Sequence, residues 1–281
     1  MILVDFSQLM VGGLMAHAKS QNDVSEDLLR HMVLNTLRSY RKQYHKTYGE
    51  LVLCIDSRHY WRRDVFPNYK HGRKKQRDDS KFDWPAIFSW FDKIRSELEE
   101  NFPYKVIDVL GAEADDVIGV LTKYKHMEEK ILILSSDKDF IQVHKYKNVK
   151  QYSPMQHKWV RHPDPIGYAK EHIIRGDHGD GIPNFLSSDD CLVEGVRQTP
   201  VSKKKVEVWL TQNPEEICTN AEMAERWKRN SQLTQFDEVP ELLINDILRR
   251  FKREPKGARK KLYNYFVMNK LQNLMEVIGD F

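Results

Sequence analysis

Eight acidic side chains stand at positions from which they could act together on a phosphodiester bond. They follow short apolar runs or lie in glycine-containing turns: Asp5, Asp56, Glu113, Asp115, Asp137, Asp139, Asp177 and Asp180. So many carboxylates in one place would repel one another and take up protons unless cations lay among them. Oxygen-rich clusters with little histidine suit hard divalent ions, above all Mg²⁺ and also Mn²⁺. Two such ions about 4 Å apart orient an attacking hydroxide and stabilise charge on the phosphate, so the predicted chemistry is phosphodiester hydrolysis.

Each acid, taken singly, also has a structural interpretation. An Asp at the end of a strand often caps a helix or begins a turn. Asp115 and Asp116 could be acids of a first helical turn, where the helix dipole favours negative charge. We expect Asp116 to have that structural role. Capping does not require Asp at the same edge of several separate strands, so the joint occurrence favours a metal site.

Four short apolar runs predict the strands that would bring the acids together. The runs cover residues 2–4, 51–55, 106–107 and 131–134, and each suits a strand that is covered on both faces. Helical periodicity at 29–44 and 88–98 lies between them. This alternation predicts an α/β core over residues 1–163, with a mostly parallel central sheet flanked by helices. Ligands bind at the carboxyl ends of such strands, and three of the four runs lead directly into Asp.

The rest of the composition limits the class of protein. The 281 residues include 45 Lys and Arg against 41 Asp and Glu, and 40% are hydrophobic, too many for a disordered chain. No apolar run reaches the roughly 18 residues of a membrane span, and residues 1–6 suit a buried strand better than a signal peptide. Three cysteines at unrelated spacings predict neither a disulfide framework nor a zinc site. We therefore expect a cytoplasmic protein.

The segment from Arg58 to about Lys81 breaks the α/β pattern. Between 58 and 77 it holds eight Lys or Arg and one acid, so it should be an exposed, mobile excursion that begins just after Asp56. Cations at the rim of an acidic site would offset its repulsion of nucleic acid. Lys70 and Arg73 would share one face of a helix if a helix forms there. A solvated loop is the alternative.

The acidic motifs resemble those of the structure-specific 5′ nucleases, the family of flap endonucleases and polymerase-associated 5′ exonucleases. The matching residues are Asp5, Asp56, Gly-Ala-Glu-Ala-Asp-Asp at 111–116, Ser-Ser-Asp-Lys-Asp-Phe at 135–140 and Gly-Asp-x-x-Asp at 176–180. Stretches at 53–56, 60–64, 144–146, 148–151, 153–155 and 193–195 narrow the resemblance to the phage-encoded ribonuclease H branch of the family. That branch is unrelated to the ordinary ribonuclease H fold. The resemblance spans residues 2 to 281.

The resemblance implies two Mg²⁺ ions, or Mn²⁺, and removal of short 5′ pieces or 5′ flaps from RNA–DNA and DNA duplexes, as in primer removal during phage replication in the host cytoplasm. Carried over by position, the first ion would be surrounded by Asp5, Asp56, Asp115 and Asp137, with Glu113 acting through water. Asp139, Asp177 and Asp180 would hold the second ion. Gly181 stands where the family usually has Asn, a departure that bears on the second ion.

The resemblance also implies how nucleic acid would be held. Residues 58–81 would form a basic arch over the site, with Lys70 and Arg73 on the scissile phosphate and Tyr69 stacked on a base. Arg62 and Arg63 are weaker candidates, because they could simply pair with Asp64.

The helical region 164–281 would grip the duplex through a helix-turn-helix whose turn at 176–183 holds K⁺, helped by Lys203, Lys204 and Lys205. The basic run 249–261 and a last helix marked by apolar residues from 263 to 278 end this region. A partner for this end would be a phage single-stranded-DNA-binding protein.

Two other functions stay open. One is an endoribonuclease of the related PIN fold, which ordinarily lacks both a long arch and the Gly-Asp-x-x-Asp turn. The other is a noncatalytic nucleic-acid-binding scaffold, which would not need all eight acids. The eleven histidines show no spacing typical of a metal site, so no histidine ligand is predicted.

Overall fold

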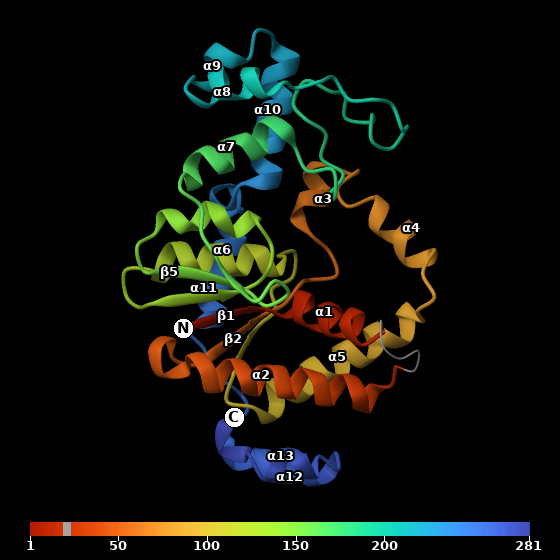
Figure 1. Ribbon diagram of the computed structural model, residues 1–281, viewed down its shortest axis with the longest axis vertical. Helices are drawn as coiled ribbons and strands as arrows, with labels where there is room; N and C mark the ends of the chain where they lie inside the picture. The colour runs from red at the N-terminus through yellow and green to blue at the C-terminus, as the bar shows by residue number, and fades with distance from the viewer. Residues whose placement is uncertain (19–23) are drawn as a thin grey trace.

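A six-stranded sheet forms the centre of the molecule (Figure 1). The structure is a computed structural model, and it describes residues 1–18 and 24–281. The strand order is β3-β2-β1-β4-β5-β6, and only β6 runs antiparallel to its neighbour. The strands are β1 (Ile2–Asp5), β2 (Leu51–Cys54), β3 (Lys105–Ile107), β4 (Ile131–Leu134), β5 (Val149–Ser153) and β6 (Lys158–Val160). The predicted mostly parallel sheet is confirmed, whereas β5 and β6 were not predicted.

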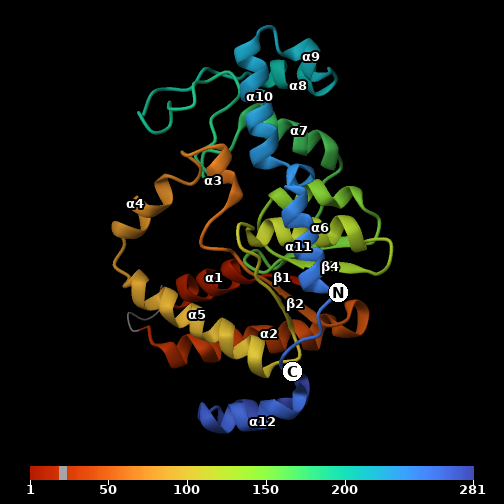
Figure 2. The ribbon, with the colours of Figure 1, turned by 180° about the vertical axis from the view of Figure 1, so that it is seen from behind.

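Helices cover both faces of this sheet, which explains why residues 2–4, 51–54 and 131–134 of its central strands are all apolar. Alternate residues of a strand point to opposite faces, so Ile2 and Val4 belong to one core and Leu3 to the other. The first core is shared with α2 (Glu26–Tyr48), α5 (Trp84–Asn101) and α1 (Phe6–Ala18). The second is shared with α6 (Ala114–Lys125) and α11 (Glu241–Phe251). Figure 2 shows α6 and α11 on the side opposite to α2.

The helices begin where the sequence offers capping groups. Ser25 accepts a hydrogen bond from the backbone N–H of Leu28, and Asp83 accepts one from that of Ala86. At the start of α6, Glu113 and Asp116 form a reciprocal capping box. This last cap fixes Asp116 in the structural role that the sequence predicted for it.

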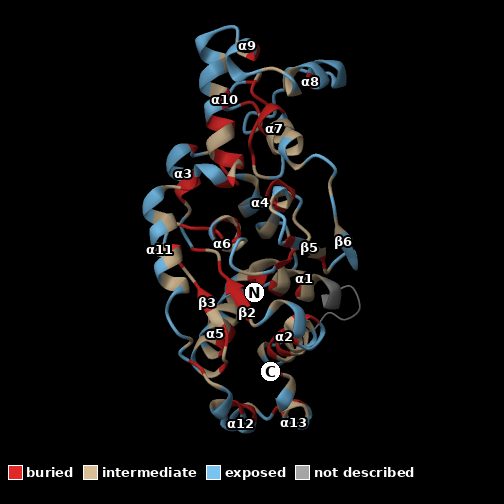
Figure 3. Ribbon diagram, turned by 90° about the vertical axis from the view of Figure 1, so that its left-hand side faces the viewer, coloured by how far each residue is buried: buried red, intermediate tan, exposed pale blue. Residues whose placement is uncertain are grey.

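The carboxyl-terminal half is helical and has a small core of its own. Its upper part contains α7 (Pro165–Arg175), α8 (Lys203–Leu210), α9 (Pro214–Ile217) and α10 (Ala221–Thr234), packed around Phe185, Ile174 and Trp227. Most of the surface of α8 and α9 is exposed (Figure 3). The predicted helix-turn-helix differs in one respect, because irregular chain separates the 176–183 turn from α8.

The predicted last helix is wrong in its extent. Residues 259–280 form α12 (Arg259–Met268), α13 (Gln272–Met275) and a final 3₁₀ turn, η3 (Ile278–Asp280). Lys270, between α12 and α13, has a positive φ of 55°, which ends the helical path. The break lets the chain turn back, so that Phe281 packs in the core against Phe102 and Phe266. No helix in the described parts of the chain is long and apolar enough to cross a bilayer.

The basic arch leaves the core after β2 and returns at α5. It contains two short helices, α3 (Trp61–Val65) and α4 (Gly72–Asp78), and it runs along one side of the molecule (Figures 1 and 2). Its first part is not an open loop, because Phe66 and Tyr69 are buried against Ile182 and Leu233. Arg73 and Lys75 of α4 remain exposed. The mobility of the arch stays a prediction.

Candidate active site

Four acids gather at the carboxyl edge of the parallel strands. Asp5 is the last residue of β1 and is buried. Its two carboxylate oxygens accept hydrogen bonds from the backbone N–H of Gln8 and from the Ser135 hydroxyl, each with a donor–acceptor distance of 3.0 Å. Asp56 follows β2 and accepts a bond of 2.7 Å from the backbone N–H of Ala114. Asp115 lies in the first turn of α6, and Asp137 follows β4. We refer to Asp5, Asp56, Asp115 and Asp137 as the sheet-edge acids.

The sheet-edge acids carry more negative charge than their surroundings can stabilise. Burial, together with the nearby charges of Asp56 and Asp137, raises the pKa of Asp5 to about 7. Burial also raises the pKa of Asp115, as do the charges of Asp137 and Asp5. Buried carboxylates that disfavour one another's charge are the donor set that a hard divalent cation stabilises. The residues therefore fit a divalent metal ion.

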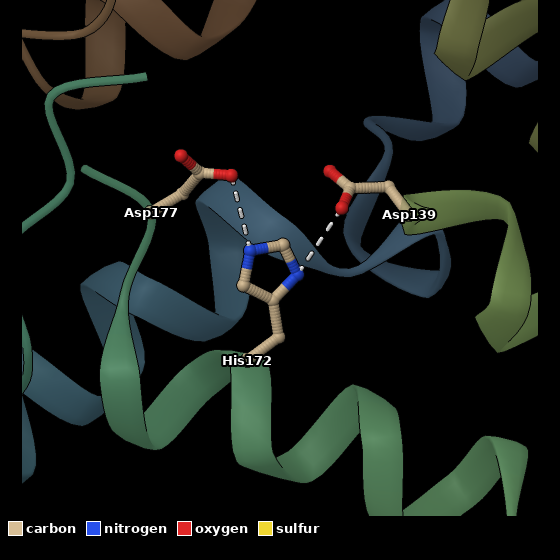
Figure 4. Close-up of side chains that lie close together, drawn as sticks. All are labelled: Asp139, His172 and Asp177. Atoms are coloured by element: carbon tan, nitrogen blue, oxygen red, sulfur yellow. Dashed lines mark ion pairs between the residues drawn. The ribbon is translucent and has the colours of Figure 1, made fainter. Parts of the chain in front are cut away.

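A second group of ligand atoms lies beside the first, where α7 meets the 3₁₀ helix η1 (Asp139–Lys145) (Figure 4). His172 projects from α7 between two carboxylates, with Nδ1 3.4 Å from Asp139 Oδ1 and Nε2 3.4 Å from Asp177 Oδ2. One ligand atom from each of these three residues lies within 4.8 Å of the others. We call Asp139, His172 and Asp177 the histidine cluster. Its histidine was missed by the sequence analysis.

The charges within the histidine cluster are unequal. Burial raises the pKa of Asp139 to about 7, although His172 opposes this. The adjacent imidazole lowers the pKa of Asp177 to about 2. Burial disfavours the charged form of His172 itself, but the carboxylates of Asp177 and Asp139 outweigh it and raise its pKa. The two carboxylates thus favour the charged form of an imidazole that burial disfavours.

Glu113 and Asp180 are paired with basic and phenolic groups of the arch. Glu113 accepts hydrogen bonds from Arg62 Nη1 and from the Tyr69 hydroxyl, each with a donor–acceptor distance of 3.0 Å. It accepts a third from Lys70 Nζ. Burial alone would raise the pKa of Glu113, but Lys70 and Arg62 reverse this and lower it. Asp180 lies 2.6 Å from Arg73 Nη2 and 3.6 Å from Lys70 Nζ. These two predicted metal ligands therefore contact protein cations in this structure.

Two of the residues predicted to contact nucleic acid lie inside the protein. Arg62 has a side chain only 3% exposed, and it lies 2.7 Å from Asp116 Oδ1 instead of pairing with Asp64. Tyr69 is buried, and its hydroxyl bonds to Glu113, so its ring is not open to a base. Neither side chain is open to nucleic acid while the first part of the arch is packed against the core.

The remaining predicted nucleic-acid contacts lie at the surface, except for Lys70. Arg63 is exposed, with its guanidinium over the Tyr60 ring. Lys203, Lys204 and Lys205 are exposed in the first turn of α8. Lys70, by contrast, is only 6% exposed and has a left-handed φ of 56°. The backbone N–H of Lys70 donates a hydrogen bond to the carbonyl of Asp180 at a distance of 2.7 Å. This bond holds the arch on the turn at 176–183.

This turn explains the glycine at 181. Gly181 has a φ of +74°, and a Cβ there would lie 2.7 Å from His71 Nδ1 and 2.9 Å from the Asn68 carbonyl oxygen. No side chain, Asn included, fits while the arch is packed in this position. Glycine in place of the family's usual asparagine at position 181 therefore accompanies close packing between the turn and the arch.

Comparisons with known proteins agree with this geometry. The family described as "5'-3' exonuclease, N-terminal resolvase-like domain" matches residues 1–170, and that described as "T4 RNase H, C terminal" matches residues 168–281. Ribonuclease H of Enterobacteria phage T4 is 36% identical over 293 residues, covering 99% of this chain and 95% of the relative.

Two solved structures of bacteriophage T5 proteins share the fold. A D15 flap endonuclease in complex with DNA and metal ions has a TM-score of 0.61 at 16% identity and covers 90% of this chain and 99% of its own. A T5 5′-exonuclease with bound zinc has a TM-score of 0.59 at 14% identity and covers 90% and 98%. The chain described above therefore belongs to the 5′–3′ exonuclease family, in the branch of T4 ribonuclease H, and is a nuclease.

Proposed function

We propose that this nuclease is a Mg²⁺-dependent 5′ to 3′ exonuclease and flap endonuclease that acts near the 5′ ends of RNA–DNA and DNA duplexes and removes RNA primers during phage replication. The observation that carries the proposal is the gathering of the four sheet-edge acids from separate elements, in which Asp5 is buried and has its pKa raised to about 7. Such a site is unfavourable as a structural element and suits a cation that binds phosphate.

The acids divide into two proposed metal sites. Asp5, Asp56, Asp115 and Asp137 would hold the first ion, with Glu113 acting through water. Asp139, Asp177 and Asp180 would hold the second. When bound, the ions supply a hydroxide nucleophile and stabilise negative charge on the phosphate. The hydrogen bonds from Gln8, Ser135 and Ala114 fix the carboxylate orientations before substrate arrives, which is the protein's own contribution.

The arch supplies positive charge beside these acids. We propose that Lys70 and Arg73 exchange their contacts with Asp180 for oxygens of the scissile phosphate. Arg73 Nη2 is exposed and lies 2.6 Å from that carboxylate, whereas Lys70 Nζ lies 3.6 Å from it, is buried and also pairs with Glu113, so Lys70 would reach a phosphate only after the arch shifts. The contact would grow stronger as charge develops in the transition state, so it would act on turnover more than on binding.

Duplex binding is assigned to the helical region, whose boundary with the core we place at residues 163 and 164. Lys203, Lys204 and Lys205 would contact the phosphate backbone together with Arg63, and the turn at 176–183 would hold K⁺ against a phosphate. A phage single-stranded-DNA-binding protein remains the proposed partner of the carboxyl-terminal end.

The basic run at 249–261 is less available to that partner than its sequence implied. Arg250 and Lys256 contact Glu99, while Arg259 contacts Glu50.

A nicked and a flapped duplex, each labelled at the 5′ end, test the proposal. With Mg²⁺ we expect short labelled products, none in EDTA, and loss of cleavage in Asp137→Asn. Glu171→Gln is the matched control, since this half-exposed acid of α7 forms an ion pair within the described residues only with Arg175. Cleavage that survives EDTA, or that is unchanged in Asp137→Asn, would contradict the proposed reaction.

A further inference from the structure

His172 occupies a position between the predicted ligands of the second ion. It stands in the last turn of α7, and its carbonyl accepts the hydrogen bond from Gly176 N–H that closes the helix. Its side chain is 12% exposed, and it faces Asp139 on one side and Asp177 on the other (Figure 4). The cluster borders a cavity of about 570 Å³ that is also lined by Asp137, one of the sheet-edge acids. The imidazole therefore faces the space where substrate and ion would meet.

The distances within the cluster distinguish ligand geometry from hydrogen bonding. Good N–H···O bonds measure about 2.7–3.2 Å between heavy atoms, so the 3.4 Å between His172 Nδ1 and Asp139 Oδ1 is long for one. Two atoms that each bind one ion at about 2.1 Å, at an angle of roughly 90 to 110°, lie about 3.0–3.4 Å apart. The observed separation matches the second arrangement.

The hydrogen-bonding state of Nδ1 points the same way. This nitrogen is buried and has no hydrogen-bond partner within the described residues. A buried polar atom without a partner is costly, and an ion bound between it and Asp139 would remove that cost. Nε2 lies at the same distance, 3.4 Å, from Asp177 Oδ2, and one ligand atom from each of the three residues lies within 4.8 Å of the others.

We propose that His172 is a nitrogen ligand of the second divalent ion, which it binds together with Asp139 and Asp177. The inference rests on the proposed two-metal function and extends it, because the family resemblance supplied only oxygen ligands. Imidazole nitrogen favours first-row transition metals over Mg²⁺, whereas carboxylates suit Mg²⁺. The second site should therefore prefer Mn²⁺ over Mg²⁺ more strongly than the first site does.

Electron spin echo spectroscopy of the full-length protein loaded with two equivalents of Mn²⁺ detects such a ligand directly. We expect ¹⁴N modulation in the wild type, and its replacement by the ¹⁵N pattern when histidine is labelled with ¹⁵N. His172→Gln should lose the modulation and bind the second Mn²⁺ roughly tenfold more weakly. His178→Gln is the matched control, since His178 is exposed in the adjacent turn, and it should keep the modulation.

The wild-type spectrum decides the matter even if a variant folds poorly. Bound Mn²⁺ without histidine modulation overturns the proposal, as does modulation that persists in folded His172→Gln. Mg²⁺-dependent cleavage is measured on the same wild-type sample. Cleavage without histidine modulation refutes the nitrogen ligand alone, whereas failure to bind Mn²⁺ together with absence of cleavage refutes the two-metal function as well.

Discussion

Arg62→Ala should destabilise the protein strongly, because Arg62 is a buried structural cation. Its guanidinium lies 3.0 Å from Glu113 and 2.7 Å from Asp116, and Asp116 is completely buried. Its Nε also donates to the carbonyl of Leu233 over 2.8 Å, which ties the arch to α10. Removing the cation would leave Asp116 with only the neutral donors Trp61 Nε1 and the backbone N–H of Glu113.

The size of the effect follows from the buried partner that remains. Breaking a buried ion pair by removing one side costs about 3–5 kcal/mol, since the other charge is left desolvated. Glu113 keeps Lys70 and Tyr69, so Asp116 carries most of this cost. For a chain of this size, each kcal/mol lowers the melting temperature by about 2–4 °C. Arg62→Ala should therefore melt roughly 6–20 °C lower than the wild type.

Thermal unfolding followed by circular dichroism measures the difference in melting temperature, and urea unfolding measures the difference in free energy. Arg63→Ala is the matched control. Arg63 is exposed and contacts only the Tyr60 ring in the described structure, so its replacement should change stability by less than about 0.5 kcal/mol. Arg62→Ala with wild-type stability and weaker duplex binding would refute the structural role. It would show instead that the arch releases Arg62 to nucleic acid.

Three further predictions concern the charges of the site. Lys70→Ala should slow cleavage roughly hundredfold or more while nearly preserving duplex affinity, as measured by single-turnover kinetics and titration; unchanged turnover would contradict it. Asp5→Asn should stabilise the metal-free protein at pH 8 by roughly 1–3 kcal/mol and reduce the stabilisation by Mg²⁺, both read from urea unfolding. Because the folded, metal-free chain raises the pKa of Asp5 to about 7, it binds that proton more tightly than the unfolded chain does, and stability falls as pH rises towards 8. The metal-free protein should therefore be more stable at pH 6 than at pH 8, Mg²⁺ should reduce the difference, and equal urea midpoints would argue against it.

The sheet was predictable because its strands carry a strong local signal. Residues 2–4, 51–54 and 131–134 are apolar at every position, which only a sheet covered on both faces explains. The strands β5 and β6 lack that signal, since Lys150 and Trp159 have exposed side chains. The pairing of β5 and β6 depends on tertiary contacts, which the sequences of such short strands do not indicate.

The places where prediction failed depend on contacts between distant segments. Nothing in the local sequence indicates that Arg62 meets Asp116 or that His172 meets Asp139, because each pair is made by the packing of separate elements. His172 and Asp177 are five residues apart, on either side of the Gly176 that ends α7, and their side chains lie next to each other. This spacing matches no metal-binding motif. Likewise the apolar pattern after residue 262 continues through Lys270, where the backbone turns.

Anomalous diffraction from crystals soaked in Mn²⁺ tests the central claim most directly, since it locates bound ions without reference to activity. We predict one peak among Asp5, Asp56, Asp115 and Asp137, and a second beside Asp139 and Asp177. If no peak appears at either place, or if peaks appear only at unrelated surface carboxylates, the assignment of these acids to divalent cations would be contradicted.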